Sequence, residues 1–266
     1  MEVATTDDSD FLTEFSDPAG PDPAAQLLKR ELMDMILWNE RESPRSKQVS
    51  IGPSELGAEC DRRIAYKLAN VPEVNTLADP WPAIVGTSIH DWLEKAINRY
   101  QAHHGDRGWL TELGVYPDPL VKGRSDVYNQ RLRTVVDHKS AGADVMRKVN
   151  KGKIPQGYIV QIQIYGLGHI LAGRPVEHVA LAFYPRSGWL DDMVVWRTPY
   201  DESVARGAIK RMYEIGYKLL DLEIEQNPHR FGLIESTPGD GCAFCPWFSR
   251  ELHQDVAPSE KGCPGT

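Results

Sequence analysis

The stretch Lys122–Ser140, KGRSDVYNQRLRTVVDHKS, limits which fold this chain can adopt. It predicts two strands joined by a turn over residues 129–130, with Asp126 near the end of the first strand. Successive side chains of a strand point to opposite faces, so Asp137 and Lys139 are expected to share a face. Pairing of the two strands would bring the carboxylate of Asp126 beside that of Asp137.

Two carboxylates and one ammonium at a single point suit metal-assisted hydrolysis of a phosphodiester. Carboxylates are hard oxygen ligands, and Mg²⁺ typically binds one or two of them together with substrate phosphate and water. A nearby lysine can stabilise developing negative charge or steady the attacking hydroxide. The alternative, which Asp137 and Lys139 alone favour, is a cross-strand salt bridge on the surface of a hairpin.

Charge is unevenly placed along the 266 residues, whose net charge is −8. Residues 1–24 hold seven acids and no Lys or Arg, whereas residues 121–153 hold nine Lys or Arg against three Asp. Basic charge therefore gathers around the predicted site, where a polyanion such as a nucleic acid would approach. The alternative is a solvated, charged hairpin face.

Residues 1–24 are predicted to be a disordered acidic tail. Hydrophobic periodicity predicts helices over residues 25–41, 82–100, 156–171 and 201–226, and strands over residues 110–116, 121–128, 132–138, 176–184 and 191–197. This order indicates an α/β fold with a mixed central sheet flanked by helices. No apolar run approaches the roughly 20 residues that cross a bilayer, and the acidic start is no signal peptide, so a cytoplasmic location is expected.

Three further polar residues lie on the predicted helices. His90 closes the string GTSIH at the edge of an apolar helix face, where a histidine is more often packed than a ligand. Gln161 and Tyr165 are four residues apart, so they share a helix face and both could hydrogen-bond a phosphate. The alternative is a surface glutamine and a core aromatic residue.

Cysteines provide a second pattern. Cys242 and Cys245 form a CxxC motif, Cys263 lies close to the C-terminus, and Cys60 lies far upstream. In a reducing compartment this pattern favours metal or redox chemistry over structural disulfides. Thiolate-only sets suit zinc or an iron–sulfur cluster, and the alternative is four unrelated buried thiols.

Together these motifs resemble the PD-(D/E)XK nuclease superfamily, in particular its RecB-like branch with an iron–sulfur cluster. That branch includes the CRISPR-associated Cas-four exonucleases, their phage-borne relatives and the AddB nuclease domain, and the likeness is to a phage-type member. The resemblance covers roughly residues 50–266 and rests on six motifs in order. These are Cys60, the GxxxH string ending at His90, GRSD ending at Asp126, Asp137-His138-Lys139 as D-x-K, Gln161 and Tyr165 as QxxxY, and Cys242, Cys245 and Cys263.

The resemblance implies a restriction-endonuclease-like core with a C-terminal cysteine-cluster lid. It implies one nuclease domain over residues 25–266, with residues 50–70 and 228–266 forming the iron–sulfur region. A [4Fe–4S] cluster would be bound by the four cysteines and would clasp the two ends of the domain. Seventeen residues separate Cys245 from Cys263, which is longer than the usual spacing in this family.

The resemblance also implies roles at the predicted site. His90, Asp126 and Asp137 would bind Mg²⁺ or Mn²⁺, assisted by the backbone carbonyl of His138. Lys139 would position or activate the nucleophilic water. The pair Gln161 and Tyr165 would help to bind DNA near the scissile phosphate.

The function that follows is a metal-dependent DNA exonuclease acting on single strands or DNA ends, in recombination, repair or CRISPR adaptation. Its expected partners are DNA and a helicase, recombination or CRISPR-adaptation protein. Relatives form rings, but the sequence leaves open whether this chain is a homo-oligomer. No GxxxxGK[ST] motif is present, so the chain carries no motor of its own. Two alternatives remain: a non-catalytic, cluster-stabilised DNA-binding subunit, and a zinc protein whose hairpin charges are structural.

Overall fold

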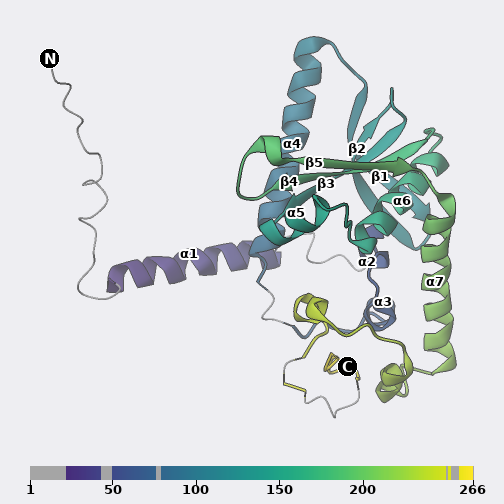
Figure 1. The fold of residues 1–266 in the computed structure, drawn as a ribbon. Coiled ribbons are helices and arrows are strands. Elements are labelled where there is room, and N and C mark those ends of the chain that lie inside the picture. Colours follow the sequence, from purple (N-terminus) through teal and green to yellow (C-terminus); the bar gives the residue numbers. More distant parts are fainter. Residues whose placement is uncertain (1–21, 43–49, 76–78, 250, 253–257, 266) are drawn as a thin grey trace. The chain divides into compact units, whose positions relative to one another are not determined.

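The computed structural model describes all of the chain except residues 1–21, 43–49, 76–78, 250, 253–257 and 266 (Figure 1). The chain divides into two units, residues 1–48 and residues 49–266. The first contains α1, Pro23–Glu42, in which no residue is buried. The predicted tail falls almost wholly outside the described residues. The predicted boundary at residue 25 assigns α1 to the nuclease domain, whereas α1 belongs to the first unit.

A five-stranded sheet in the order β1-β2-β3-β4-β5 forms the centre of the second unit (Figure 1). Its strands are β1 (Trp109–Asp118), β2 (Val121–Asn129), β3 (Thr134–Ala141), β4 (His178–Pro185) and β5 (Val194–Pro199). Neighbouring strands are antiparallel except β3 and β4, which are parallel. A parallel pair needs a long crossover, and here two helices supply it. The predicted mixed sheet flanked by helices is confirmed.

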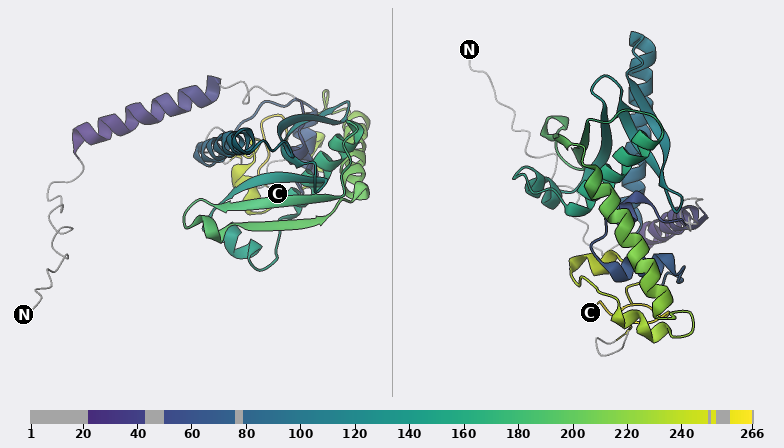
Figure 2. Two further views of the ribbon diagram at one scale, coloured as in Figure 1. Left: turned by 90° about the horizontal axis from the view of Figure 1, so that it is seen from above. Right: turned by 90° about the vertical axis from the view of Figure 1, so that its right-hand side faces the viewer.

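The α-helices of the second unit are α2 (Pro53–Leu56), α3 (Asp61–Leu68), α4 (Trp81–His104), α5 (Ala143–Val149), α6 (Gln156–Leu171) and α7 (Glu202–Asp221). Helices lie on both faces of the sheet (Figures 1 and 2). The helix α6 contacts β1, β3 and β4, α7 packs on α6, and α4 contacts β1 and β3 from the opposite face. Within the described residues, no helix is long and apolar enough to span a bilayer.

The helix α6 belongs to two hydrophobic cores, which explains why its sequence is apolar on all sides. Residues 161–169 are all buried. Ile162 and Tyr165 pack with the sheet, whereas Ile164 and Leu167 pack with α2, α3 and α7. At the start of α6 the backbone crosses α2 so closely that a Cβ atom on Gly157 would lie 2.8 Å from the carbonyl oxygen of Gly57. This helix therefore fixes the sheet against the rest of the unit.

The C-terminal segment is fastened to α3 by long-range contacts. The Arg62 guanidinium donates to the carbonyl oxygen of Ile234 at 3.0 Å. The Tyr66 hydroxyl donates to the carbonyl oxygens of Ser259 and Gly262, and its ring stacks on Trp247 with 5.8 Å between centroids. Cys60 caps the start of α3, so these contacts bring it to the segment that carries the other three cysteines.

The turn of the predicted hairpin is longer than the predicted one over residues 129–130. The second strand begins at Thr134, two residues after the predicted Leu132, because residues 130–133 form a longer turn. Arg133 adopts a left-handed φ of 45°, and the Asn129 side chain accepts a hydrogen bond from the Leu132 amide at 2.9 Å. Side-chain capping by Asn129 therefore competes with strand pairing at this end.

Three other elements differ from the prediction. The lysine-bearing loop before α6 contains α5, which is too short to show a clear period. The last strand begins at Val194 because residues 190–192 form a short 3₁₀ turn held by the Asp192 carboxylate. The helix α7 ends at Asp221, before the predicted Gln226, since Glu223 takes a left-handed φ of 47°.

Candidate active site

The site lies where β2 and β3 separate. The described pairs between these strands end at Val127 and Val136, and one more step in the same register would set Asp126 against Asp137. Instead, the Asp126 carboxylate accepts a hydrogen bond from the backbone amide of His138 at 2.7 Å. The Asp126 side chain thus lies in the gap between the two separating strands. This gap, beyond Val127 and Val136, is called the fork below, and it brings the two acids near one another.

On one face of β3, three side chains form a closed network. The ammonium of Lys139 lies 2.7 Å from Asp137 Oδ2 and donates to Gln161 Oε1 at 2.8 Å. Gln161 in turn donates from Nε2 to Asp137 Oδ1 at 3.3 Å and to the Tyr165 hydroxyl at 3.4 Å. Because α6 holds both Gln161 and Tyr165, this helix positions the ammonium against the strand.

On the other face of the sheet, His90 of α4 approaches Asp126. Its Nδ1 atom lies 3.4 Å from Asp126 Oδ1, and its ring meets that of His138 edge-on with 5.9 Å between centroids. His138 Nδ1 lies 3.2 Å from the Tyr184 hydroxyl, while its buried Nε2 atom has no partner among the described residues. Asp126 at the fork is therefore in contact with two histidines, His90 from α4 and His138 from β3.

The two acids have opposite pKa shifts. Burial opposes ionisation of Asp126, but the hydrogen bond and charge of His90 and the amide of His138 outweigh it, so the pKa of Asp126 is lowered. Burial raises the pKa of Asp137 to about 6; the neighbouring charge of Asp126 adds to this shift, and the Lys139 ammonium opposes it. Asp126 is thus the more readily ionised of the pair.

The two imidazoles also differ. Burial disfavours protonation of His90, but the hydrogen bond and charge of Asp126 overcome it, so the pKa of His90 is raised. Burial lowers the pKa of His138 to about 4 although Asp126 opposes this shift. His138 is therefore neutral near pH 7. Its buried Nε2 atom, which has no hydrogen-bond partner among the described residues, lies within the site.

Two residues of the site were absent from the sequence prediction. Glu112 lies opposite Asp126 in the register of β1 with β2 and has a left-handed φ of 51°, and Arg124 pairs with it at 3.0 Å. Burial, together with the charge of Asp126, raises the pKa of Glu112.

The second residue is Tyr158 of α6, whose ring centroid lies 4.5 Å from Lys139 Nζ. Only the spacing of Tyr158 from Gln161, three residues along one helix face, offered a sequence signal.

The donor atoms at the fork suit a hard divalent cation, since they comprise carboxylate oxygens and an imidazole nitrogen. The residues that could hold it are Asp126, Asp137 and His90, with the carbonyl of His138 nearby. Within the described part of the chain, no three His, Cys, Asp or Glu side chains converge closely enough to enclose an ion as they stand. Binding therefore requires Lys139 or His90 to yield part of its contact with the acids.

All four cysteines line one small cavity of about 30 Å³, together with Arg62, Tyr66 and Phe248 among others. The thiols form no disulfide. The long spacing before Cys263 is bridged by pairing of its backbone with residues 247–249. Its sulfur accepts hydrogen bonds from Arg62 at 3.5 Å and from the Gly265 amide at 3.4 Å. Thiols are the donor type that suits a soft metal or a cluster. As they stand, however, no three of these four described thiols converge closely enough to enclose an ion.

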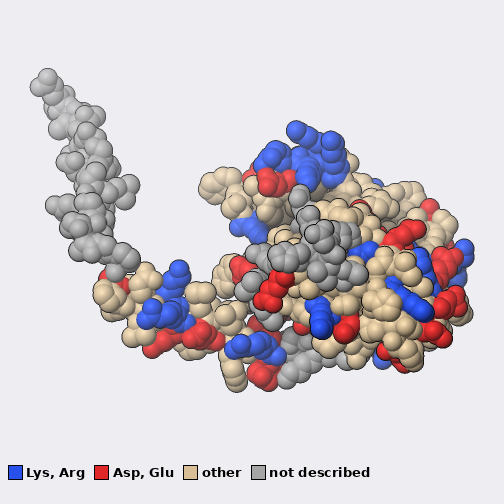
Figure 3. Space-filling model, turned by 90° about the horizontal axis from the view of Figure 1, so that it is seen from below, with Lys and Arg blue, Asp and Glu red and all other residues tan. Residues whose placement is uncertain are grey.

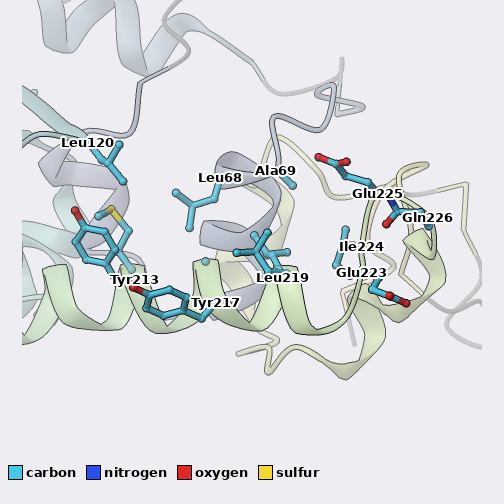
Figure 4. Close-up of a pocket in the computed structure, with 13 residues that line it drawn as sticks. Leu68, Ala69, Leu120, Tyr213, Tyr217, Leu219, Glu223, Ile224, Glu225 and Gln226 are labelled. Atoms are coloured by element: carbon cyan, nitrogen blue, oxygen red, sulfur yellow. The ribbon is translucent and has the colours of Figure 1, made fainter.

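A second hollow, a groove of about 580 Å³, lies between α3 and α7 (Figure 4). Leu68, Tyr213 and Tyr217 are among its lining residues, and its only acids are Glu223 and Glu225 at one end. It contains none of the predicted site residues. The predicted site residues lie instead at the fork and at the cysteine cavity.

No family model and no curated protein matches the chain. Among solved structures, the alkaline exonuclease LHK-Exo from Laribacter hongkongensis is similar with a TM-score of 0.48 and 14% identity, over 68% of this chain and 93% of that one. The protein SSO0001 is similar with a TM-score of 0.46 and 19% identity, over 87% and 98%. A phage-related exonuclease from Haemophilus somnus 129PT has a TM-score of 0.37 and 13% identity, over 51% and 70%. At these scores the likeness assigns the chain to no family.

Proposed function

We propose that this chain is a metal-dependent DNA nuclease of the PD-(D/E)XK type. The observation that carries the proposal is the network of Asp137, Lys139 and Gln161 beside the buried carboxylate of Asp126. Two acids with opposite pKa shifts and a lysine held against one of them are poorly explained as a structural salt bridge. A buried ion pair is weak evidence for stability, whereas perturbed acids are common at functional sites.

His90, Asp126 and Asp137, with the carbonyl of His138, would hold Mg²⁺ or Mn²⁺. When bound there, a divalent ion supplies neutralisation of negative charge on the scissile phosphate. Asp137 must be ionised to take part, and because its pKa is raised to about 6, metal binding would weaken as the pH falls below that value. The lowered pKa of Asp126 favours its charged, metal-binding form.

The chain's own groups would carry the remaining work. Lys139 would orient the attacking water and stabilise charge that develops on the phosphate. Gln161 holds the ammonium at 2.8 Å, so it would keep Lys139 aimed at the fork. Tyr165, within reach of Gln161, would contact DNA on the same helix face.

We propose that the enzyme is an exonuclease and that its substrate is single-stranded DNA or a DNA end. Its proposed location is the cytoplasm. Recombination, repair or CRISPR adaptation would use the same chemistry, with a helicase or another DNA-processing protein supplying the strand. Exposed cations on α5, next to the site, support a polyanionic substrate. Membership of the RecB-like branch is part of the same proposal.

The test is a cleavage assay on end-labelled single-stranded and duplex DNA with Mn²⁺. Wild-type protein should release nucleotides, whereas Asp137→Asn and Lys139→Met should be slower by about 100-fold or more, as for other electrostatic stabilisers. Lys139→Met should still bind DNA. Cleavage at the wild-type rate by Asp137→Asn would refute the assignment, and equal losses of binding and rate in Lys139→Met would make Lys139 a phosphate anchor.

We propose in addition that the four cysteines bind a [4Fe–4S] cluster that fastens the C-terminal segment to α3. Support comes from their common cavity and from the long-range contacts of Arg62 and Tyr66 around it. Burial raises the pKa of the Cys245 thiol, so thiolate formation there would depend on metal binding. Ligand energy at such a site would add directly to folding stability.

Iron and sulfide measured per chain after anaerobic purification test this second proposal. Wild-type protein should contain both and be brown, and Cys242→Ala should contain neither and be poorly soluble. Since the chain has only four cysteines, Cys263→Ala should also lose iron. A full iron content in Cys263→Ala would remove Cys263 from the ligands, and zinc without sulfide in the wild type would overturn the cluster.

A further inference from the structure

A tryptophan projects from the edge of the sheet beside the candidate active site. Because β3 and β4 are parallel, their carboxyl ends meet at the same edge, where Lys139 pairs with Phe183 and Ala141 with Pro185. The connection from β4 to β5 starts there, and Trp189 lies in it. At most about 20 Å of chain separates Phe183 from Trp189, since a residue spans at most about 3.5 Å.

The Trp189 side chain is 80% exposed, and Leu190 beside it is 72% exposed. The backbone beneath Trp189 is held in place. Its amide donates to the Asp192 carboxylate at 3.1 Å, and its carbonyl accepts from the Asp192 amide at 3.0 Å. Arg186 fastens the start of the connection to β3 by donating from its amide to the Ala141 carbonyl at 2.9 Å. A large aromatic ring is thus presented to solvent on a fixed turn.

Cations lie beside this turn on α5 and the residues that follow it. Arg147, Lys148, Lys151 and Lys153 are all exposed. Figure 3 shows Lys and Arg side chains gathered at its upper edge. Arg147 pairs with Asp144, whereas the three lysines have no ion pair among the described residues. The views agree that α5 lies beside the β4–β5 connection (Figures 1 and 2).

The local charge remains positive when the acids are included. Arg186 joins these four cations, and the acids Asp144, Asp191 and Asp192 oppose them, which leaves +2 on a chain whose net charge is −8. An aromatic platform next to a basic track is the combination that binds single-stranded nucleic acid. The cations contact phosphates, and the ring stacks on a base.

We propose that Trp189 stacks on an unpaired base of single-stranded DNA whose phosphates lie along α5, on the way to the fork. The proposal rests on the nuclease function above and names its preferred substrate as a single strand. Bases in a duplex are already stacked, so the exposed ring offers them little. Trp189 is a binding residue and takes no part in the bond cleavage.

Binding is measured by fluorescence anisotropy in EDTA, so that no cleavage occurs. The probes are labelled oligothymidylate, the same backbone without bases, and a blunt duplex. Trp189→Ala should weaken binding of oligothymidylate by about 5- to 100-fold, the worth of one stacked base, and leave the base-free strand and the duplex unchanged. Trp189→Phe should retain most of the affinity. Tyr217→Ala, which removes another exposed aromatic residue on α7, should have no effect.

Lys148→Gln with Lys151→Gln should weaken binding to both single strands and reduce the slope of log affinity against log salt by about 0.7 for each phosphate that is no longer neutralised. Unchanged oligothymidylate binding by Trp189→Ala would overturn the inference, as would equal weakening on the strand without bases. Absence of metal-dependent cleavage together with a Trp189 effect would refute the nuclease and leave this binding site standing. Metal-dependent cleavage by the wild type without an effect of Trp189→Ala on binding would support the nuclease and refute the binding site at Trp189.

Discussion

The Asp126 Oδ2 atom accepts a hydrogen bond from the backbone amide of His138, with 2.7 Å between oxygen and nitrogen, at the point where β2 and β3 stop pairing. One oxygen of Asp126 is thereby held by the backbone that carries Asp137 and Lys139, and the other lies 3.4 Å from His90 Nδ1. The bond therefore ties the acid of one strand to the catalytic candidates of the next. It makes Asp126 both a part of the fold and a part of the site.

Asp126→Asn separates these two roles, because an amide oxygen can still accept the His138 amide but carries no charge. We expect the variant to stay folded and to bind Mn²⁺ at least about 10- to 100-fold more weakly. Titration calorimetry with Mn²⁺ measures the affinity, and Asp144→Asn, an exposed acid on α5, is the control. Wild-type affinity in Asp126→Asn would show that Asp126 is structural only.

Tyr158 is expected to hold Lys139 through its ring, which lies 4.5 Å from the ammonium. Tyr158→Leu removes the aromatic face and should slow cleavage at saturating DNA by about 5- to 30-fold, the worth of about 1–2 kcal/mol of cation–π attraction. Tyr158→Phe keeps the face and should cleave almost as fast as wild type. Equal slowing in both variants would assign the effect to the hydroxyl instead.

The close crossing of Gly57 and Gly157 predicts a stability effect away from the site. Gly157→Ala places a Cβ atom 2.8 Å from the Gly57 carbonyl oxygen and should lower the free energy of unfolding by about 1–3 kcal/mol. Gly207→Ala on α7 meets open space and should raise it by about 0.5–1 kcal/mol. Urea unfolding compares the two, and a Gly157→Ala protein as stable as wild type would show that the helices can separate without cost.

His169 predicts how stability depends on pH. It is fully buried, its Nδ1 accepts from Arg174 at 2.8 Å, and burial together with the charge of Arg174 lowers its pKa to about 4. Between about pH 6.5 and 4 the unfolded chain binds this proton and the folded chain does not. Stability is therefore full above pH 6.5 and falls as the pH is lowered, by up to about 3 kcal/mol from this residue.

His169→Gln removes this titration and keeps an acceptor for Arg174. The variant's free energy of unfolding should change less than that of wild type between pH 7 and pH 4.5. His138, whose pKa is also lowered to about 4, stays in both proteins and cancels in the comparison. Parallel pH curves for the two proteins would mean that the pKa of His169 is the same in the folded and the unfolded chain.

Elements with a strong local period were predictable. The helix over residues 156–171 has the same bounds in the structure, and the strands before it differ by a few residues. The length of the turn before Thr134 and the presence of the helix α5 were not predicted. In the first a side chain of Asn129 replaces backbone pairing, and the second is only seven residues long, so neither leaves a period in the sequence.

The sequence by itself determined the order of the motifs and the kind of atoms they supply: carboxylates and a lysine on a hairpin, an amide and a phenol on a helix, and four thiols. Only the tertiary structure decided which of these atoms meet. Glu112 enters the neighbourhood of Asp126 through a left-handed residue in β1, and Tyr158 reaches Lys139 from α6. Cys263 joins Cys60 in one cavity although 203 positions separate them (263 − 60). The physical reason is that local patterns report the face on which a side chain lies, whereas contacts across the fork and the cavity depend on packing between segments far apart in the chain.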